Sequence, residues 1–114
     1  MTGFLTTHVL DTASGLPAAG MTIDLYQLNG DTRTHVVTMI TNDDGRTDSP
    51  ILPSTDFAVG TYELVFQAGA YFARDEDIRF IDEVPIRFGM NDSTSHYHVP
   101  LLVAPFRFST CRGS

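Results

Sequence analysis

The chain is divided into short strand-like runs, and this division constrains its fold more than any other feature of the sequence. Residues 21–28 alternate, with Thr22, Asp24 and Tyr26 on one face and Ile23 and Leu25 on the other. Such period-two runs, separated by turn residues, predict an all-β sandwich rather than a helical protein. Eight strands are expected, at 4–11, 21–28, 33–41, a short segment beginning at Arg46, 61–68, 84–88, 96–103 and 106–111.

Turn residues and one helical segment complete this expected architecture. Asn29-Gly30-Asp31 is a strong hairpin signal. Residues 69–77 are the only helix candidate and are expected to cover one end of the sheets. Pro100 lacks a backbone donor, so its strand should lie at an edge or at a break in the ladder. Eight strands and one short helix leave little room for a deep pocket, so a ligand site is expected on a sheet face or between subunits.

Length and composition predict one domain covering residues 1–114. The 114 residues are 42% hydrophobic and 18% charged, as in a packed globular protein. All seven basic residues are arginines, which excludes lysine Schiff-base chemistry. The net charge of −7 argues against nucleic acid or an anionic membrane as a partner. Cys111 is the single cysteine, and no membrane span or secretory signal is recognised, so a cytoplasmic location is expected.

Four polar features are candidates for chemistry: His8, Arg46, the pair His96 and His98, and the C-terminal segment 111–114. His96 and His98 are two residues apart and therefore share one strand face. Each feature also has an ordinary explanation. A strand histidine is usually a half-buried, hydrogen-bonded side chain, an arginine after a turn is often exposed or paired with a nearby aspartate, and chain ends commonly fray.

A metal site is an alternative interpretation of the same residues. His8, His96, His98 and Cys111 are nitrogen and sulfur ligands of the kind that zinc accepts. The sequence has no Cys-x-x-Cys or His-Glu-x-x-His motif, so these ligands would have to converge through the fold alone. We therefore expect no metal. The sequence gives even less support for catalysis by a serine nucleophile, because no Gly-x-Ser-x-Gly motif is present.

Five segments in order resemble one known family. They are Leu5-Thr6-Thr7-His8-Val9-Leu10-Asp11, Thr41-Asn42-Asp43-Asp44-Gly45-Arg46, Gly60-Thr61-Tyr62-Glu63-Leu64, Asp82-Glu83-Val84-Pro85-Ile86-Arg87-Phe88 and His96-Tyr97-His98-Val99-Pro100-Leu101-Leu102. Together they resemble the 5-hydroxyisourate hydrolases, the transthyretin-like enzymes of urate breakdown. The resemblance runs from about Leu5 to Ser114, which is nearly the whole chain.

The resemblance implies a fold, a reaction and an assembly. The fold is an eight-stranded transthyretin-like sandwich with one short helix, which agrees with the strand count above. The reaction is the hydrolysis of 5-hydroxyisourate to 2-oxo-4-hydroxy-4-carboxy-5-ureidoimidazoline, without a metal or an organic cofactor. The assembly is a homotetramer whose active sites lie in a channel at an interface between dimers. A non-catalytic carrier of transthyretin type, with the same channel, is the alternative function.

The resemblance also implies the site residues. The catalytic set falls on His8, Arg46, His98 and Ser114, whereas His96 is not counted as catalytic. Cys111, Arg112 and Gly113 are implied as substrate-binding residues. The family's C-terminal signature is Tyr-Arg-Gly-Ser, and Cys111 replaces its tyrosine.

The replaced tyrosine helps to wall the pocket of the enzymes, so Cys111 is expected to widen the site and weaken activity. The thiol itself is expected to be an inert small hydrophobe; the alternative is a cross-link between subunits.

The chemistry of ring opening assigns a role to each implied catalytic residue. Hydrolysis needs a water, a group that takes its proton, and positive charge where the oxyanion develops. We expect His98 to be the general base and His8 to orient the water or to protonate the leaving nitrogen. Arg46 would bind the substrate carbonyl through its fork of donors, and Ser114 would hold the water or a histidine tautomer. A domain that only pairs its sheet edges with partners is a third possibility.

Overall fold

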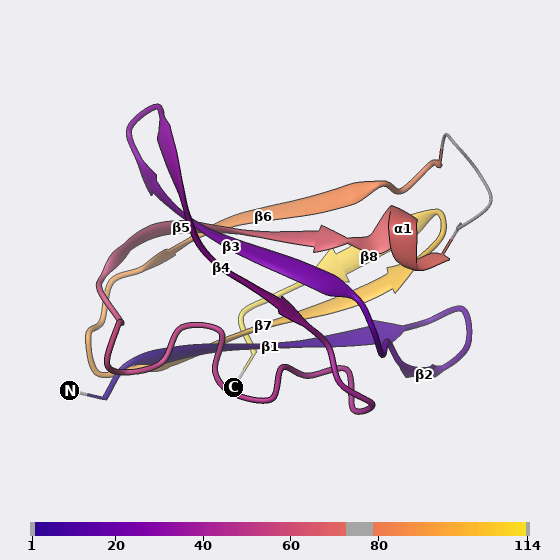
Figure 1. The fold of residues 1–114 in the computed structure, drawn as a ribbon, viewed down its shortest axis with the longest axis horizontal. Helices are drawn as coiled ribbons and strands as arrows, with labels where there is room; N and C mark the ends of the chain where they lie inside the picture. The colour runs from indigo at the N-terminus through magenta and orange to yellow at the C-terminus, as the bar shows by residue number, and fades with distance from the viewer. Residues whose placement is uncertain (1, 73–78, 114) are drawn as a thin grey trace.

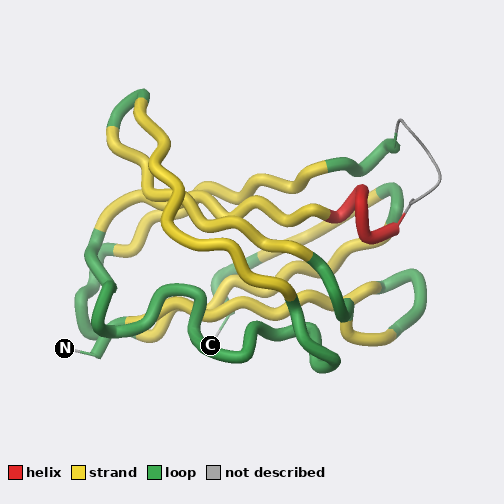
Figure 2. Tube along the Cα trace, viewed as in Figure 1, coloured by secondary structure: helices red, strands yellow, loops and turns green. Residues whose placement is uncertain are grey.

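The computed structural model describes residues 2–72 and 79–113, which form two four-stranded sheets and one short helix (Figures 1 and 2). The first sheet has the order β2-β1-β7-β8, and the second has the order β4-β3-β5-β6. The strands of the first sheet are β1 Phe4–Asp11, β2 Leu16–Pro17, β7 His96–Ala104 and β8 Arg107–Thr110. Those of the second are β3 Thr22–Asn29, β4 Thr32–Ile40, β5 Gly60–Gln67 and β6 Glu83–Met90, and the helix α1 is Ala68–Phe72.

The core lies between the two sheets because each strand turns every second side chain inward. On β1, Leu5 and Val9 are completely buried, whereas Phe4, Thr6 and His8 on the opposite face are only partly covered. Burial of the apolar face drives the sheets together, at about 25 cal/mol for each Å² of apolar surface removed from water. The same alternation leaves the outer face of the first sheet available for polar side chains. Further core residues are Ile23, Leu25, Leu64, Phe66, Val84, Leu101 and Val103.

The pairing of β1 with β7 decides which residues meet on that outer face. These two strands are parallel, whereas the other neighbouring strands described are antiparallel. The register places Phe4 beside His96 and Thr6 beside His98. Because parallel partners keep their alternation in phase, Phe4, Thr6, His96 and His98 project from the same side of the sheet.

Residues 41–59 form a long connection that runs beside β1 (Figures 1 and 2). The backbone of Leu5 exchanges two hydrogen bonds with Leu52, at 2.9 and 3.3 Å. Farther along β1, the backbone N–H of Val9 donates to the carbonyl of Gly45 at 2.8 Å. These contacts fix the connection against the same strand that carries Thr6 and His8.

The predicted eight-stranded sandwich is confirmed, but two of its elements differ from the expectation. The strand expected to begin at Arg46 is absent from the described elements, and Arg46 makes only an isolated bridge to His8. The amide oxygen of Asn42 accepts from the Arg46 backbone and closes a turn there, which prevents extended pairing. Instead, Leu16 and Pro17, which lie outside the strands expected from the sequence, form the short β2 against the end of β1.

Two further expectations concern the helix and Pro100. The helix begins at Ala68, one residue before the predicted start, and is described to Phe72; the remainder of the predicted helix, residues 73–77, lies outside the described residues. Pro100 is not on an edge strand, since β7 lies between β1 and β8. It does lie where a ladder stops, because pairing with β8 begins only at Leu101. No helix in the described ranges has the length and apolar character needed to cross a membrane.

Candidate functional site

A cleft of about 340 Å³ lies on the outer face of the first sheet, beside the connection 41–59. We call it the histidine cleft, and its lining includes Thr6, Arg46, Asp48, Ser49, His96 and His98. The sheet contributes Thr6 and the two histidines, and the connection contributes the other three. A concave site lined by polar side chains on a packed sheet is a suitable place for a small polar ligand.

His98 is the half-buried histidine of this cleft. Its Nδ1 lies 2.7 Å from the hydroxyl oxygen of Thr6. Burial lowers the pKa of His98 below its usual range, and the charges of His96, Arg46 and His8 lower it further. At neutral pH the ring is therefore neutral, which is the state required of a general base.

His96 differs from His98 because it is exposed. Its Nε2 lies 2.7 Å from the same Thr6 hydroxyl oxygen. Its ring stacks on that of Phe4, with centroids 4.1 Å apart and an interplanar angle of 10°. Thr6 therefore stands between the two histidines, and Phe4 fixes the orientation of the outer one.

Arg46 enters the cleft from a glycine turn. Gly45 has φ of 75°, and a Cβ added to it would clash with the carbonyl oxygen of Val9. A glycine is therefore needed for the turn to approach β1 this closely. Within the described ranges, the Arg46 guanidinium has no ion-pair partner. Asp48, an aspartate close to Arg46 in the sequence, accepts a hydrogen bond from the side chain of Asn42 instead, at 3.0 Å.

His8 lies beside the histidine cleft rather than among its lining residues. Its backbone forms a bridge with Arg46, and its strand register places it beside Pro100. The side chain is partly buried, and its charge is one of those that lower the pKa of His98. The structure thus brings three of the four residues implied as catalytic into one region.

The C-terminal segment reaches this region through its backbone. The N–H of Gly113 donates to the carbonyl of His98 at 2.7 Å, and a Cβ on Gly113 would lie 2.7 Å from Cδ2 of the His98 ring. Gly113 is therefore packed against the His98 ring, and a larger residue at position 113 would displace this ring. Ser114, the fourth implied catalytic residue, lies outside the described residues.

Cys111 and Arg112 lie away from the histidine cleft in the single chain. They line a separate hollow of about 230 Å³ together with Ile86, Phe88 and Tyr97. The Arg112 guanidinium carbon lies 4.2 Å from the centre of the Tyr97 ring. The structure thus separates these two implied substrate-binding residues from Gly113, which contacts His98.

The zinc alternative finds no ligand set here. In residues 2–72 and 79–113, no group of three or more His, Cys, Asp or Glu side chains is placed to hold a metal ion. Cys111 lines the other hollow, and the rings of His96 and His98 are 6.1 Å apart with the Thr6 hydroxyl between them. The histidines are thus engaged with a hydroxyl group.

Thr6 and Phe4 are the parts of the site that the sequence does not reveal. Both precede His8 at period-two spacing, so their shared face with His8 could be foreseen. Their contact with His96 and His98 depends on the parallel pairing of β1 with β7, across about ninety residues of sequence. No local pattern in the sequence sets that register.

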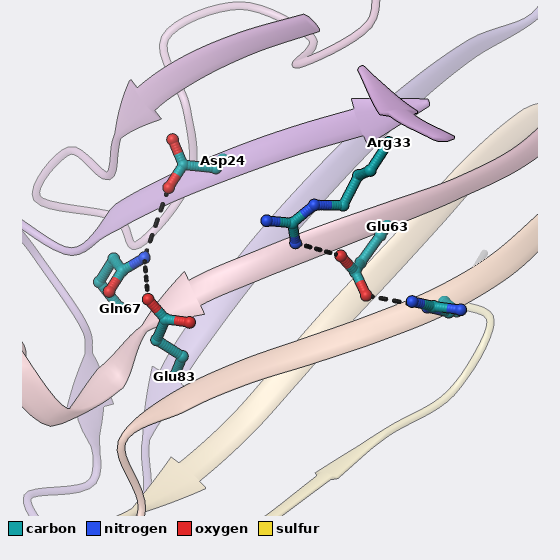
Figure 3. Close-up of polar contacts among 6 residues, drawn as sticks. Asp24, Arg33, Glu63, Gln67 and Glu83 are labelled. Atoms are coloured by element: carbon teal, nitrogen blue, oxygen red, sulfur yellow. Dashed lines mark hydrogen bonds and ion pairs between the residues drawn. The ribbon is translucent and has the colours of Figure 1, made fainter. Parts of the chain in front are cut away.

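A second polar cluster lies on the outer face of the other sheet. Glu63 has a buried carboxylate that accepts from Arg33 at 2.7 Å and from Arg87 at 3.0 Å. Figure 3 shows the first of these contacts, and beside it the amide of Gln67 pointing between Asp24 and Glu83. We call the trio of Arg33, Glu63 and Arg87 the charged cluster. Burial acts to raise the pKa of Glu63, but the two arginines outweigh it and the pKa is lowered.

Comparison with known proteins places this geometry in context. The profile of the HIUase/transthyretin family matches residues 5–113. The 5-hydroxyisourate hydrolase 2 of Rhizobium meliloti (strain 1021) is 56% identical over an alignment that covers 98% of this chain and 97% of that protein.

Solved structures agree with this match. The structure of the 5-hydroxyisourate hydrolase of Klebsiella pneumoniae is 34% identical in sequence and superposes with a TM-score of 0.81. The match covers 97% of this chain and 99% of that chain. The crystal structure of an (S)-allantoin synthase is 46% identical with a TM-score of 0.90, and 99% of this chain matches 44% of the longer chain.

Proposed function

The chain belongs to the HIUase/transthyretin family, and we propose that it is an enzyme that hydrolyses 5-hydroxyisourate to 2-oxo-4-hydroxy-4-carboxy-5-ureidoimidazoline. The observation that carries this proposal is that a neutral, half-buried His98 shares one cleft with Arg46, which has no ion-pair partner in residues 2–72 and 79–113. A base and a free cation side by side are what the opening of a cyclic amide requires.

The proposed reaction begins with water in the histidine cleft. As the water oxygen attacks the ring carbonyl, His98 takes one of its protons through Nε2, since its Nδ1 faces Thr6. The guanidinium of Arg46 donates hydrogen bonds to the carbonyl oxygen on which negative charge develops. The ring C–N bond then breaks, and the leaving nitrogen receives a proton. No step is assigned to a metal or an organic cofactor.

His8 and the C-terminal segment are assigned supporting roles. We assign His8 to orient the water or to protonate the leaving nitrogen, which its position beside Arg46 supports. Gly113 keeps the C-terminal segment against His98, so the hydroxyl or terminal carboxylate of Ser114 is assigned to the water or to a histidine tautomer. Cys111 and Arg112 stay proposed substrate-binding residues. In one chain they line a different hollow, so this role requires the assembled protein.

The assembly proposed for this function is a homotetramer of the family's kind, with sites at an interface between dimers. Two observations support association: β8 and β6 end their sheets, and Leu102, Phe106 and Phe108 leave 39%, 68% and 44% of their surfaces exposed. Light scattering of the purified protein is expected to give four times the chain mass of 12.5 kDa. A monomer at micromolar concentration would contradict this assembly.

The cytoplasmic location stays a prediction.

The hydrolase proposal is tested by following freshly generated 5-hydroxyisourate in the ultraviolet. We expect the protein to accelerate loss of absorbance well beyond the spontaneous rate in buffer. The Cys111→Tyr variant, which restores the family residue, should be at least as fast. If the Cys111→Tyr variant is active and the parent protein is not, Cys111 is the cause of the lost activity. If neither form exceeds the spontaneous rate, the hydrolase is excluded, and ligand binding in the assembled channel becomes the function to test.

A further inference from the structure

Thr6 connects the two histidines through one hydroxyl group. Its oxygen lies 2.7 Å from Nδ1 of His98 and 2.7 Å from Nε2 of His96. A hydroxyl has one proton, so it donates to one of these nitrogens and must accept from the other. The donor state of one ring is therefore tied to the donor state of the other.

The proposed reaction selects one of the two arrangements. For His98 to take a proton at Nε2, that nitrogen must be free, so the neutral ring must hold its proton at Nδ1. His98 Nδ1–H then donates to the Thr6 oxygen, and the Thr6 hydroxyl donates to Nε2 of His96. His96 in turn holds its own proton at Nδ1.

We propose that Thr6 is a positioning residue that holds His98 in the Nδ1–H tautomer and connects it to His96, which receives the positive charge during the reaction. This inference rests on the proposed hydrolase function. It gives His96, which the family resemblance leaves without a role, a place in the mechanism.

The transfers balance in protons and charge. When His98 Nε2 has taken the proton of the attacking water, His98 Nδ1–H passes to the Thr6 oxygen and the Thr6 hydroxyl proton passes to His96 Nε2. His98 and Thr6 are then neutral, and His96 is an imidazolium. The same transfers in reverse return a proton to His98 Nδ1, and the Nε2–H of the resulting His98 imidazolium then protonates the leaving nitrogen. Both histidines then regain their starting tautomers.

The surroundings of the two rings favour this movement of charge. The charged groups around His98 come from three elements: His8 on β1, His96 on β7, and Arg46 and Asp48 on the connection 41–59. Burial and the neighbouring cations oppose a positive charge on His98 and lower its pKa. His96 is exposed to water, and its ring lies flat against Phe4, whose π-face attracts a cation. The positive charge is therefore better accommodated on His96.

The first test removes the hydroxyl group without changing the shape of the side chain. Thr6→Val should lower kcat at least about tenfold with a smaller change in KM, and Thr6→Ser should restore most of it. Thr38→Val is the matched control, because Thr38 also contacts a histidine, His35, at 2.7 Å on the other sheet. That control should keep the activity. A Thr6→Val enzyme with kcat within twofold of the parent would overturn the proposal.

The second test follows pH and separates the two histidines. In Thr6→Val the imidazolium of His98 loses a hydrogen-bond acceptor, so the pH midpoint below which kcat falls should move down. In His96→Asn the positive charge that His96 gains on protonation is absent from the neighbourhood of His98, so the midpoint should move up while kcat falls several-fold. His35→Asn is the control and should move neither. Equal midpoints in all four proteins would contradict the coupling.

The third test does not depend on activity. The ¹⁵N chemical shifts of the His98 ring in the substrate-free protein should report the Nδ1–H tautomer, and Thr6→Val should lose this preference. A wild-type His98 with its proton at Nε2 would overturn the positioning role. An Nδ1–H ring in a protein that does not hydrolyse 5-hydroxyisourate would support the positioning and refute only the hydrolase.

Discussion

The histidine cleft and the charged cluster are both polar groups on outer sheet faces, yet they are held in opposite ways. In the charged cluster the side chains neutralise one another, with the buried Glu63 carboxylate between Arg33 and Arg87. In the histidine cleft the basic side chains are held by backbone contacts and by the neutral hydroxyl of Thr6. Arg46 remains without a carboxylate partner among the described residues.

The difference shows how one small domain separates stability from chemistry. Opposite charges that satisfy each other offset the cost of burying them, so removal of one partner destabilises the fold, but they leave nothing for a ligand. A cation held by its backbone turn, and a base kept neutral by burial, retain unsatisfied capacity for a substrate. We therefore expect substitutions in the histidine cleft to affect turnover, and substitutions in the charged cluster to affect stability.

His98→Asn should give the largest effect. Loss of the general base should lower turnover by about 10²-fold or more, equivalent to about 2.7 kcal/mol of activation free energy. Ultraviolet loss of 5-hydroxyisourate measures the turnover, and thermal unfolding should show a folded protein. His35→Asn, beside the charged cluster, should keep full turnover. A His98→Asn enzyme with unchanged turnover would remove His98 from the mechanism.

Gly45→Ala should follow, because it disturbs the turn that holds Arg46. An L-residue at φ of 75° costs about 1–2 kcal/mol, and the added Cβ would meet the Val9 carbonyl oxygen. We expect lower unfolding free energy and a loss of about tenfold in kcat/KM, since a small displacement of a binding group is costly.

Gly30→Ala separates these two effects. Gly30 has φ of 63° with nothing within 4 Å of an added Cβ, and it lies in the turn between β3 and β4, in the sheet that does not carry the cleft. The Gly30→Ala variant should have a lower melting temperature because of the strained backbone, and it should retain normal kcat/KM. Equal activity losses in the two alanine variants would show that Arg46 does not depend on its turn.

Glu63→Gln should have the smallest effect and only on stability. Loss of the carboxylate should reduce the unfolding free energy by about 1–2 kcal/mol at pH 7, a modest value because both arginines are substantially exposed and can turn to water. The rate of 5-hydroxyisourate hydrolysis should be unchanged. Chemical denaturation of the variant and the parent measures the difference in unfolding free energy.

The pH dependence of that difference has a defined sign. The folded pKa of Glu63 lies below its ordinary value of 4.5, so its contribution is complete above that pH. This contribution to the free energy of unfolding disappears as the pH falls through the lowered pKa of Glu63 in the folded protein. The stabilities of parent and variant should converge there. If the difference in unfolding free energy between parent and variant widens in acid, the arginines do not stabilise the ionised carboxylate.

Much of the fold could be predicted because local rules decide it. Period-two alternation placed Ile23 and Leu25 on one face of their strand and His96 and His98 on one face of theirs. The structure confirms both groupings, and it shows that the first pair is buried in the core and the second pair lies outside it. Arg46 shows where such rules end. Its segment was expected to be a strand, but the backbone N–H of Arg46 donates to the side-chain oxygen of Asn42, which closes a turn and leaves a single bridge to His8.

The sequence by itself determined the class of fold, which side chains of the alternating strands share a face, and the identity of His8, Arg46 and His98 as candidates. Only the tertiary structure decided that Thr6 meets His98, 92 residues away, and that Phe4 stacks on His96. The physical reason is that strand alternation is a property of the backbone of one segment. The partner and register of a strand depend on how the complete core packs, and the parallel pairing of β1 with β7 is settled only there.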